Sequence, residues 1–239
     1  MGSAVSKYPL AASNYLHYHP DMNDDHRQRI LQAAARVYAL HGWRGATTRR
    51  IADEAGVNEV TLFRQFGSKD ALLDLMMRES ARIENDAPMP PVPVNPEEEL
   101  LAWVTVRHTR TTALRAIVRH MLSDADERPD AADCAAHGPS AAAARLSDYV
   151  ATLRRHGWLA EQGEASPVEV RAAVTMLMGA VFADGMNRDI MPTMFAQPVP
   201  DTLRAYVRIF LRGLGALQEP VSRADRTADD VVHSTSDSA

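Results

Sequence analysis

Two short helical segments joined by a single glycine, within residues 47–66, constrain the fold of this chain more than any other feature. Thr47 and Asn58 are residue types that cap helix N-termini, and each precedes a short run with helical periodicity. Gly56 stands between the two runs, where the absence of a Cβ permits the positive φ of a tight turn. The sequence therefore predicts a helix-turn-helix, in which the second helix can enter the major groove of DNA.

Helical periodicity continues on both sides of this motif. Upstream, an apolar stripe runs from Asp24 to a stop near Gly42, and downstream a helix is expected over residues 69–84. Residues 85–96 contain five prolines in twelve positions, so no helix persists there and the segment marks a boundary. A polyproline ligand for a partner domain is the alternative interpretation of this segment.

The remainder of the chain also shows only helical patterns, with no credible strand, so the expected fold class is all-α. Helices are expected over the ranges 97–109, 110–125, 140–156, 167–187 and 201–217, with a polar stretch at 123–140. We expect four parts, namely a flexible tail (1–22), a three-helix helix-turn-helix domain with a connecting helix (23–84), a larger antiparallel helical domain (97–217), and a disordered tail (218–239).

Charge and composition agree with a globular protein of the cytoplasm. The net charge of −5 argues against a nucleic-acid partner, but residues 36–69 carry six basic side chains against three acidic ones. The N-terminus has no secretory pattern, and no apolar run is long enough for a membrane span. Cys134 is the only cysteine, which excludes an intramolecular disulfide and leaves a small apolar residue or a reactive sensor as its role.

One stretch resembles the DNA-binding domain of the TetR family of bacterial transcriptional regulators: the run ILQAAARVYALHGWRGATTRRIADEAGVNEVTLFRQFGSKDALL from Ile30 to Leu73. The resemblance rests on Gly42, Thr47-Thr48, Ile51-Ala52, Ala55-Gly56-Val57, Thr61-Leu62-Phe63, Phe66, Ser68-Lys69 and Leu72. Beyond residue 85 only the general helical pattern matches. The resemblance implies a homodimeric regulator of transcription that binds a palindromic operator, most often as a repressor.

The resemblance also implies a set of DNA contacts: Thr47, Thr48, Arg49, Glu59, Val60, Thr61, Phe63, Arg64, Gln65 and Lys69. The hydroxyls, amides and lysine among them are the usual donors to phosphate, which sets the register of the protein on DNA. Base reading is expected from the exposed front of the second helix. For Arg49 and Arg64, a merely solvated arginine is the alternative.

Four of these positions depart from the commonest family pattern: Glu59, Val60, Phe63 and Gln65. A carboxylate is repelled by phosphates unless it accepts a hydrogen bond from a cytosine amine, whereas a valine can pack against a thymine methyl group. Phe63 lacks the hydroxyl of the usual tyrosine. These departures alter the expected operator sequence but not the expectation of DNA binding.

The larger domain is expected to provide a dimer interface and an apolar effector pocket. The interface candidates are Val174, Leu177, Val181, Phe182, Leu203, Tyr206, Phe210 and Leu214, and packing inside one subunit is the alternative. The pocket candidates are Trp103, His120, Met121, Trp158, Met176 and Met178, for which an ordinary core position is the alternative. His108 and His120, expected on adjacent helices, could each bond a ligand or be a satisfied or surface histidine.

The pattern does not indicate an enzyme or a cofactor. There is no glycine-rich phosphate loop and no nucleophile–base pair, and Asp148, Asp184 and Asp189 are scattered acids. His17 and His19 could bind a metal, but without a third ligand an exposed tail is the simpler interpretation. The sequence predicts a repressor released by a small apolar ligand, with a ligand-independent or architectural DNA-binding protein as the alternative, and identifies neither the ligand nor the target genes.

Overall fold

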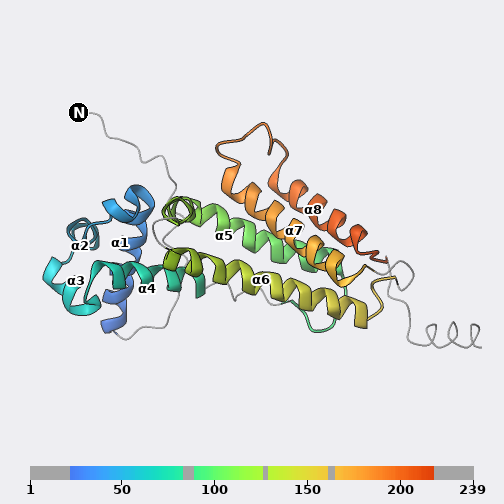
Figure 1. Cartoon of the computed structure of the whole chain (residues 1–239), viewed down its shortest axis with the longest axis horizontal. Helices are drawn as coiled ribbons and strands as arrows, with labels where there is room; N and C mark the ends of the chain where they lie inside the picture. Colours follow the sequence, from blue (N-terminus) through green and yellow to red (C-terminus); the bar gives the residue numbers. More distant parts are fainter. Residues whose placement is uncertain (1–21, 83–88, 126–128, 161–164, 218–239) are drawn as a thin grey trace, which may run out of the picture. The chain divides into compact units, whose positions relative to one another are not determined.

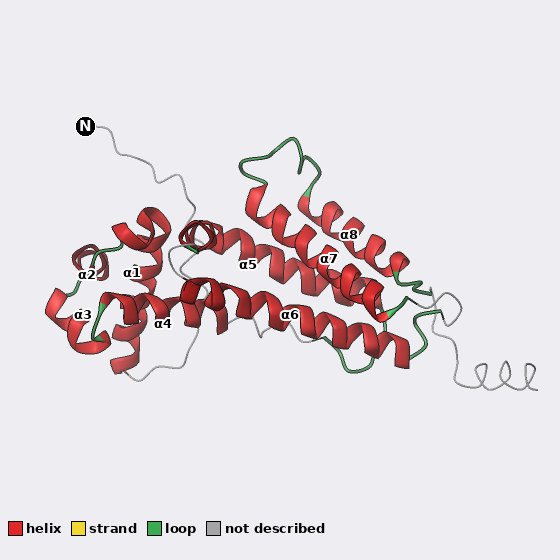
Figure 2. Cartoon of the chain, in the orientation of Figure 1, coloured by secondary structure: helices red, strands yellow, loops and turns green. Residues whose placement is uncertain are grey.

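A computed structural model describes residues 22–82, 89–125, 129–160 and 165–217 of the chain. The tails expected at 1–22 and 218–239 lie outside these residues apart from residue 22, as do His17 and His19. The side chain of Cys134 is likewise outside the description. Within the described part, the chain forms eight α-helices and no named strand, which confirms the all-α class (Figure 2).

The contacts divide the chain into two compact units, each with its own core. The first unit comprises residues 1–86 and 110–139, and the second comprises residues 87–109 and 140–239. This division runs through two helices, since residues 110–139 pack with the N-terminal part. The units follow contacts and are not continuous stretches of sequence, so they do not test the domain limits expected at 23–84 and 97–217, which stay a prediction.

The first unit contains the four N-terminal helices (Figure 1): α1 (Met22–Gly45), α2 (Thr48–Ala55), α3 (Glu59–Phe66) and α4 (Lys69–Arg82). Their inward stripes make one apolar core, to which the second half of α5 adds Ile117 and Met121. The fully buried members include Ile30, Tyr38, Ile51, Leu62, Leu72 and Met76. Ile51, Ala52 and Ala55 of α2 and Leu62 of α3 belong to this core.

The second unit contains the first half of α5 (Pro96–Asp124), most of α6 (Pro129–Arg155), α7 (Pro167–Asn187) and α8 (Val199–Gly213). Helices α7 and α8 lie side by side (Figure 1). The core that they share with α5 and α6 includes Leu100, Trp103, Leu146, Tyr149, Leu153, Val174, Leu177, Leu203 and Val207. None of the described helices has the length and apolarity that a membrane crossing requires.

Three expected helix boundaries were wrong. The ranges 97–109 and 110–125 form the single helix α5, because no glycine or proline interrupts residues 97–124. His108 and His120 therefore lie on one helix rather than on two. Helix α6 begins at Pro129, inside the expected polar stretch, because alanines on both sides of Pro139 favour a helix strongly enough to carry it through.

The last helix ends at Gly213 rather than at residue 217. Gly215 takes a φ of 71°, and the amide of Ala216 donates to the carbonyl of Leu211 at 2.9 Å, which closes the helix end. The chain then pairs with the loop after α6, where Leu159 and Ala216 form an isolated bridge. The apolar Leu214 and Leu217 extend the stripe in the sequence, which is why the helix was expected to continue.

Candidate nucleic-acid interface

Local side-chain contacts cap the N-terminus of each helix in the helix-turn-helix. The Thr47 hydroxyl accepts a hydrogen bond from the Arg50 amide at 3.3 Å, and Asn58 Oδ1 accepts from the Val60 amide at 2.9 Å. Gly56 adopts a left-handed conformation with φ 67° and ψ 39° between the two helices. The predicted caps and turn are confirmed, and together they fix where α3 begins.

Helix α3 directs its side chains in two ways. Leu62 is fully buried in the core of the first unit, and Thr61, Gln65 and Phe66 are half-buried. The opposite face presents Val60, Phe63 and Arg64 to solvent. These three side chains are available to a ligand that approaches α3, whereas the half-buried ones can be reached only at their edges.

Glu59, the first residue of α3, is engaged inside the motif. The hydroxyl of Thr48, at the start of α2, donates a hydrogen bond to the Glu59 carboxylate. The carboxylate therefore fastens α2 to α3 and is only half-exposed. The hydrogen bond from Thr48 gives the Glu59 carboxylate a partner within the motif, so this acidic side chain does not depend on a contact with DNA.

Most of the basic side chains near the motif also have partners within the first unit. Lys69 Nζ donates to the Trp43 carbonyl at 2.9 Å and lies 4.9 Å from the centre of the Trp43 ring. Arg50 donates to the Gly45 carbonyl at 2.8 Å, and Arg36 pairs with Glu54 at 2.7 Å. Fewer of these cations are therefore free to bind phosphate than the sequence count indicated.

Two cations of the motif remain available. Arg49, on α2, and Arg64, on α3, are exposed and form no hydrogen bond or ion pair with any residue that the structure describes. A guanidinium with all its donors open can bind a phosphate or the edge of a guanine. Gln65 differs, because its side-chain oxygen is buried and accepts no hydrogen bond from the described residues.

The six pocket candidates do not gather at one place. Trp103, Trp158 and Met178 pack in the core of the second unit. Met121 packs in the core of the first unit, and His120 lies on the part of α5 that belongs to that unit. Met176 is 71% exposed on the outside of α7. A ligand pocket formed by these side chains stays a prediction.

Six of the eight interface candidates lie buried in the chain's own core: Val174, Leu177, Val181, Leu203, Phe210 and Leu214. Tyr206 is half-buried, and Phe182 is exposed. Packing inside one subunit, the alternative interpretation, describes these six. The apolar side chains that α7 and α8 leave open are Val168, Met176, Phe182 and Ile209.

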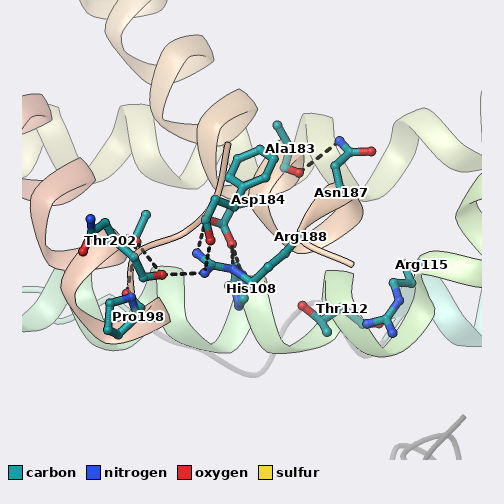
Figure 3. A network of polar contacts seen from close by, with 11 residues as sticks. His108, Thr112, Arg115, Ala183, Asp184, Asn187, Arg188, Pro198 and Thr202 are labelled. Atoms are coloured by element: carbon teal, nitrogen blue, oxygen red, sulfur yellow. Dashed lines mark hydrogen bonds and ion pairs between the residues drawn. The ribbon is translucent and has the colours of Figure 1, made fainter. Parts of the chain in front are cut away.

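Sequence reasoning missed a buried polar network in the second unit. The Asp184 carboxylate is fully buried, and it accepts hydrogen bonds from His108 Nε2 at 2.7 Å and from Arg188 Nη2 at 2.6 Å (Figure 3). Arg188 also donates to the carbonyls of Phe195 and Gln197 in the segment before α8. The network therefore joins α5, the end of α7 and the segment that leads into α8.

Charge pairing determines the ionisation of this network. Burial by itself would raise the pKa of Asp184, but the hydrogen bonds from Arg188 and His108 outweigh burial and hold that pKa below its ordinary value. The hydrogen bond to Asp184 raises the pKa of Arg188. The spacing of Asp184 and Arg188, four residues apart on a helix, was the available sequence signal, whereas His108 carried none. No described group of three or more histidine, cysteine or acidic residues could hold a metal ion.

Comparison with known proteins agrees with this architecture. Residues 30–76 match the family model described as bacterial regulatory proteins, tetR family. Among curated proteins, the HTH-type transcriptional repressor AcnR of Corynebacterium efficiens is 42% identical over 55 residues, which are 23% of this chain and 29% of that protein. The chain thus matches less than a third of the length of this relative, and the similarity is confined to the DNA-binding part.

Solved structures extend the likeness to the whole fold. A putative TetR-family regulator from Mesorhizobium loti has a TM-score of 0.68 at 18% identity, with 82% of this chain and all of that one covered. The flavonoid-responsive regulator FrrA has a TM-score of 0.60 at 19% identity, with 79% of this chain and 96% of that one covered. At such identities the likeness concerns the fold alone.

Proposed function

Because residues 30–76 match the model of the tetR family of bacterial regulatory proteins, we propose that the chain regulates transcription by binding a DNA operator through α3. The observation that carries the proposal is a doubly capped helix-turn-helix whose second helix leaves Val60, Phe63 and Arg64 open to a major groove. Arg49 and Arg64 supply the open positive charge. By analogy with the repressor AcnR, we expect the bound protein to repress transcription rather than to activate it.

Selection of binding sites from random duplex DNA with the full-length chain tests this proposal. We expect one palindromic sequence to be enriched and to bind far more tightly than random DNA. Its affinity, measured by fluorescence anisotropy, should fall steeply with salt, because each neutralised phosphate contributes a slope of about −0.9 to log K against log salt. Absence of any enriched sequence would refute the proposed function.

Two arginine variants connect the binding to the motif. Arg49→Ala and Arg64→Ala should each weaken operator binding, by about 1–3 kcal/mol where the guanidinium contacts a base and with a shallower salt slope where it contacts a phosphate. Arg78→Ala is the matched control, since this arginine is also exposed but lies on α4, outside the motif. Equal binding by all three variants would show that neither Arg49 nor Arg64 contacts the operator.

We further propose that two copies of the chain associate through the outward faces of α7 and α8. A single recognition helix binds weakly, and a palindromic site calls for a two-fold pair. The open apolar side chains Val168, Met176, Phe182 and Ile209 support this surface. Met176→Asp should shift the chain toward a monomer in analytical ultracentrifugation, whereas Leu40→Asp, at a similarly exposed residue on α1, should leave the oligomeric state unchanged.

Release of the operator by a small apolar ligand completes the proposal. Trp103, Trp158 and Met178 lie in one core and are the side chains we expect nearest to such a ligand. A library of apolar compounds, screened against the selected operator, should contain members that dissociate the complex. If every compound that binds the protein leaves operator affinity unchanged, the ligand-independent DNA-binding protein becomes the better description.

A further inference from the structure

The reading helix carries an apolar surface where hydrogen-bonding side chains would ordinarily be expected. Val60 is 72% exposed and Phe63 is 46% exposed, although both could gain stability from burial. They lie three residues apart on α3 and therefore share one face, with about 5–6 Å between their Cβ atoms. An adjacent pair of open apolar side chains at the front of such a helix calls for a binding partner.

Most polar side chains around Val60 and Phe63 are buried or form hydrogen bonds within the first unit. The Glu59 carboxylate accepts a hydrogen bond from Thr48, and the Asn58 side chain caps the Val60 amide. Gln65 is half-buried and its side-chain oxygen lies inside the unit. Arg64 is then the one open side chain of α3 with hydrogen-bond donors, among the residues that the structure describes. Apart from Arg64, the exposed side chains of α3 are therefore the apolar Val60 and Phe63.

We propose that α3 recognises thymine through its C5-methyl group, with Val60 and Phe63 as the residues that determine specificity. The inference rests on the proposed function, since it requires α3 to enter the major groove. Thymine is the one base of unmodified DNA that presents a methyl group there, and apolar side chains recognise it by contact. Base pairs are spaced by about 3.4 Å, so the two side chains reach methyl groups one or two steps apart.

Replacing thymine by deoxyuridine in the selected operator tests this inference, because uracil keeps every hydrogen-bonding group and lacks only the methyl. At the contacted positions we expect affinity to fall about fourfold per methyl group removed, the value for one buried CH₂-sized group. Elsewhere in the operator the same replacement should change nothing. Affinities are measured by fluorescence anisotropy with the full-length chain at one fixed salt concentration.

Double-mutant cycles assign each methyl to its side chain. In Val60→Ala and in Phe63→Ala, the loss on replacing the contacted thymine should disappear, because the partner of the methyl is already gone. Both side chains are exposed, so the variants should fold normally, which circular dichroism can check. Leu40→Ala, an exposed apolar residue outside α3, should keep the full fourfold loss.

The outcomes separate this inference from the proposed function. A tight operator whose affinity does not respond to deoxyuridine at any position overturns the inference and leaves the function standing. A response that persists undiminished in both alanine variants also overturns it, since other residues then contact the methyl groups. If no operator is enriched at all, both the function and the inference fail.

Discussion

The glycine that interrupts α1 allows a prediction whose magnitude follows from the structure. Gly42 has φ 61° and ψ −171°, a backbone region that is essentially restricted to glycine. A Cβ at this position would lie 2.9 Å from Nδ1 of His120 and 3.3 Å from its Cε1, closer than atoms in well-packed proteins approach. Gly42→Ala should therefore destabilise the first unit for two separate reasons.

The two contributions can be estimated separately. Backbone strain of this kind costs about 1–3 kcal/mol, and overpacking of a core costs about 1–3 kcal/mol. The half-buried His120 ring can shift by part of the required distance, so we expect a total loss of about 3 kcal/mol in the free energy of unfolding. For a chain of this length that corresponds to a fall in Tm of about 6–12 °C.

Urea unfolding, followed by circular dichroism, measures the effect in the single variants Gly42→Ala and His120→Ala and in the double variant. Removing the imidazole relieves the overlap but not the strain, so the double variant should be more stable than additivity predicts by about 1–3 kcal/mol. Gly56→Ala is a control for strain alone, because its Cβ would meet only Arg29 Nη2 at 4.0 Å. Strict additivity in the cycle would refute the contact between His120 and residue 42.

Two further predictions concern the buried network and the lysine of the motif. Asp184→Asn should lower the free energy of unfolding by about 3 kcal/mol at pH 7. Because the folded-state pKa of Asp184 is lowered, its stabilisation exists above the ordinary pKa of about 3.9 and disappears as the pH falls through the lowered value. The difference between Asp184→Asn and the unmodified protein in urea titrations should therefore shrink at pH 3, and a constant difference would contradict the charged pair. Lys69→Met should lower Tm without DNA present, because the Trp43 carbonyl and ring lose their cation; an unchanged Tm would mean that Lys69 has no structural role.

The sequence predicted the helix-turn-helix in detail because every signal in it is local. Thr47 and Asn58 cap helices through atoms within three residues, and Gly56 turns the chain by its own backbone freedom. The contacts that decide which side chains remain open are not local. Thr48 meets Glu59 across the turn, and Lys69 meets Trp43 from another helix, which no spacing rule indicates.

The helix boundaries in the middle of the chain failed for a different reason. The polar composition of residues 123–140 indicates a loop, yet helix propensity depends on backbone and side-chain entropy rather than on polarity. The segment after Pro129 is rich in alanine, the strongest helix former, and it continues through Pro139. Hydrophobic periodicity also cannot predict buried contacts between distant residues, such as the hydrogen bond between His108 and Asp184.

Helix α7 illustrates why a hydrophobic stripe cannot by itself identify a partner. The face of the helix with Val174, Leu177 and Val181 fills the core of its own chain. The opposite face keeps Val168 and Met176 in water, where each forgoes about 1.5–3 kcal/mol of burial. The same face also exposes Glu169, Arg171 and Thr175, so it is a mixed surface with apolar side chains that a partner can cover. The interface that we propose therefore lies on the outward stripe rather than the inward one, because only the outward side chains remain open to a second copy of the chain.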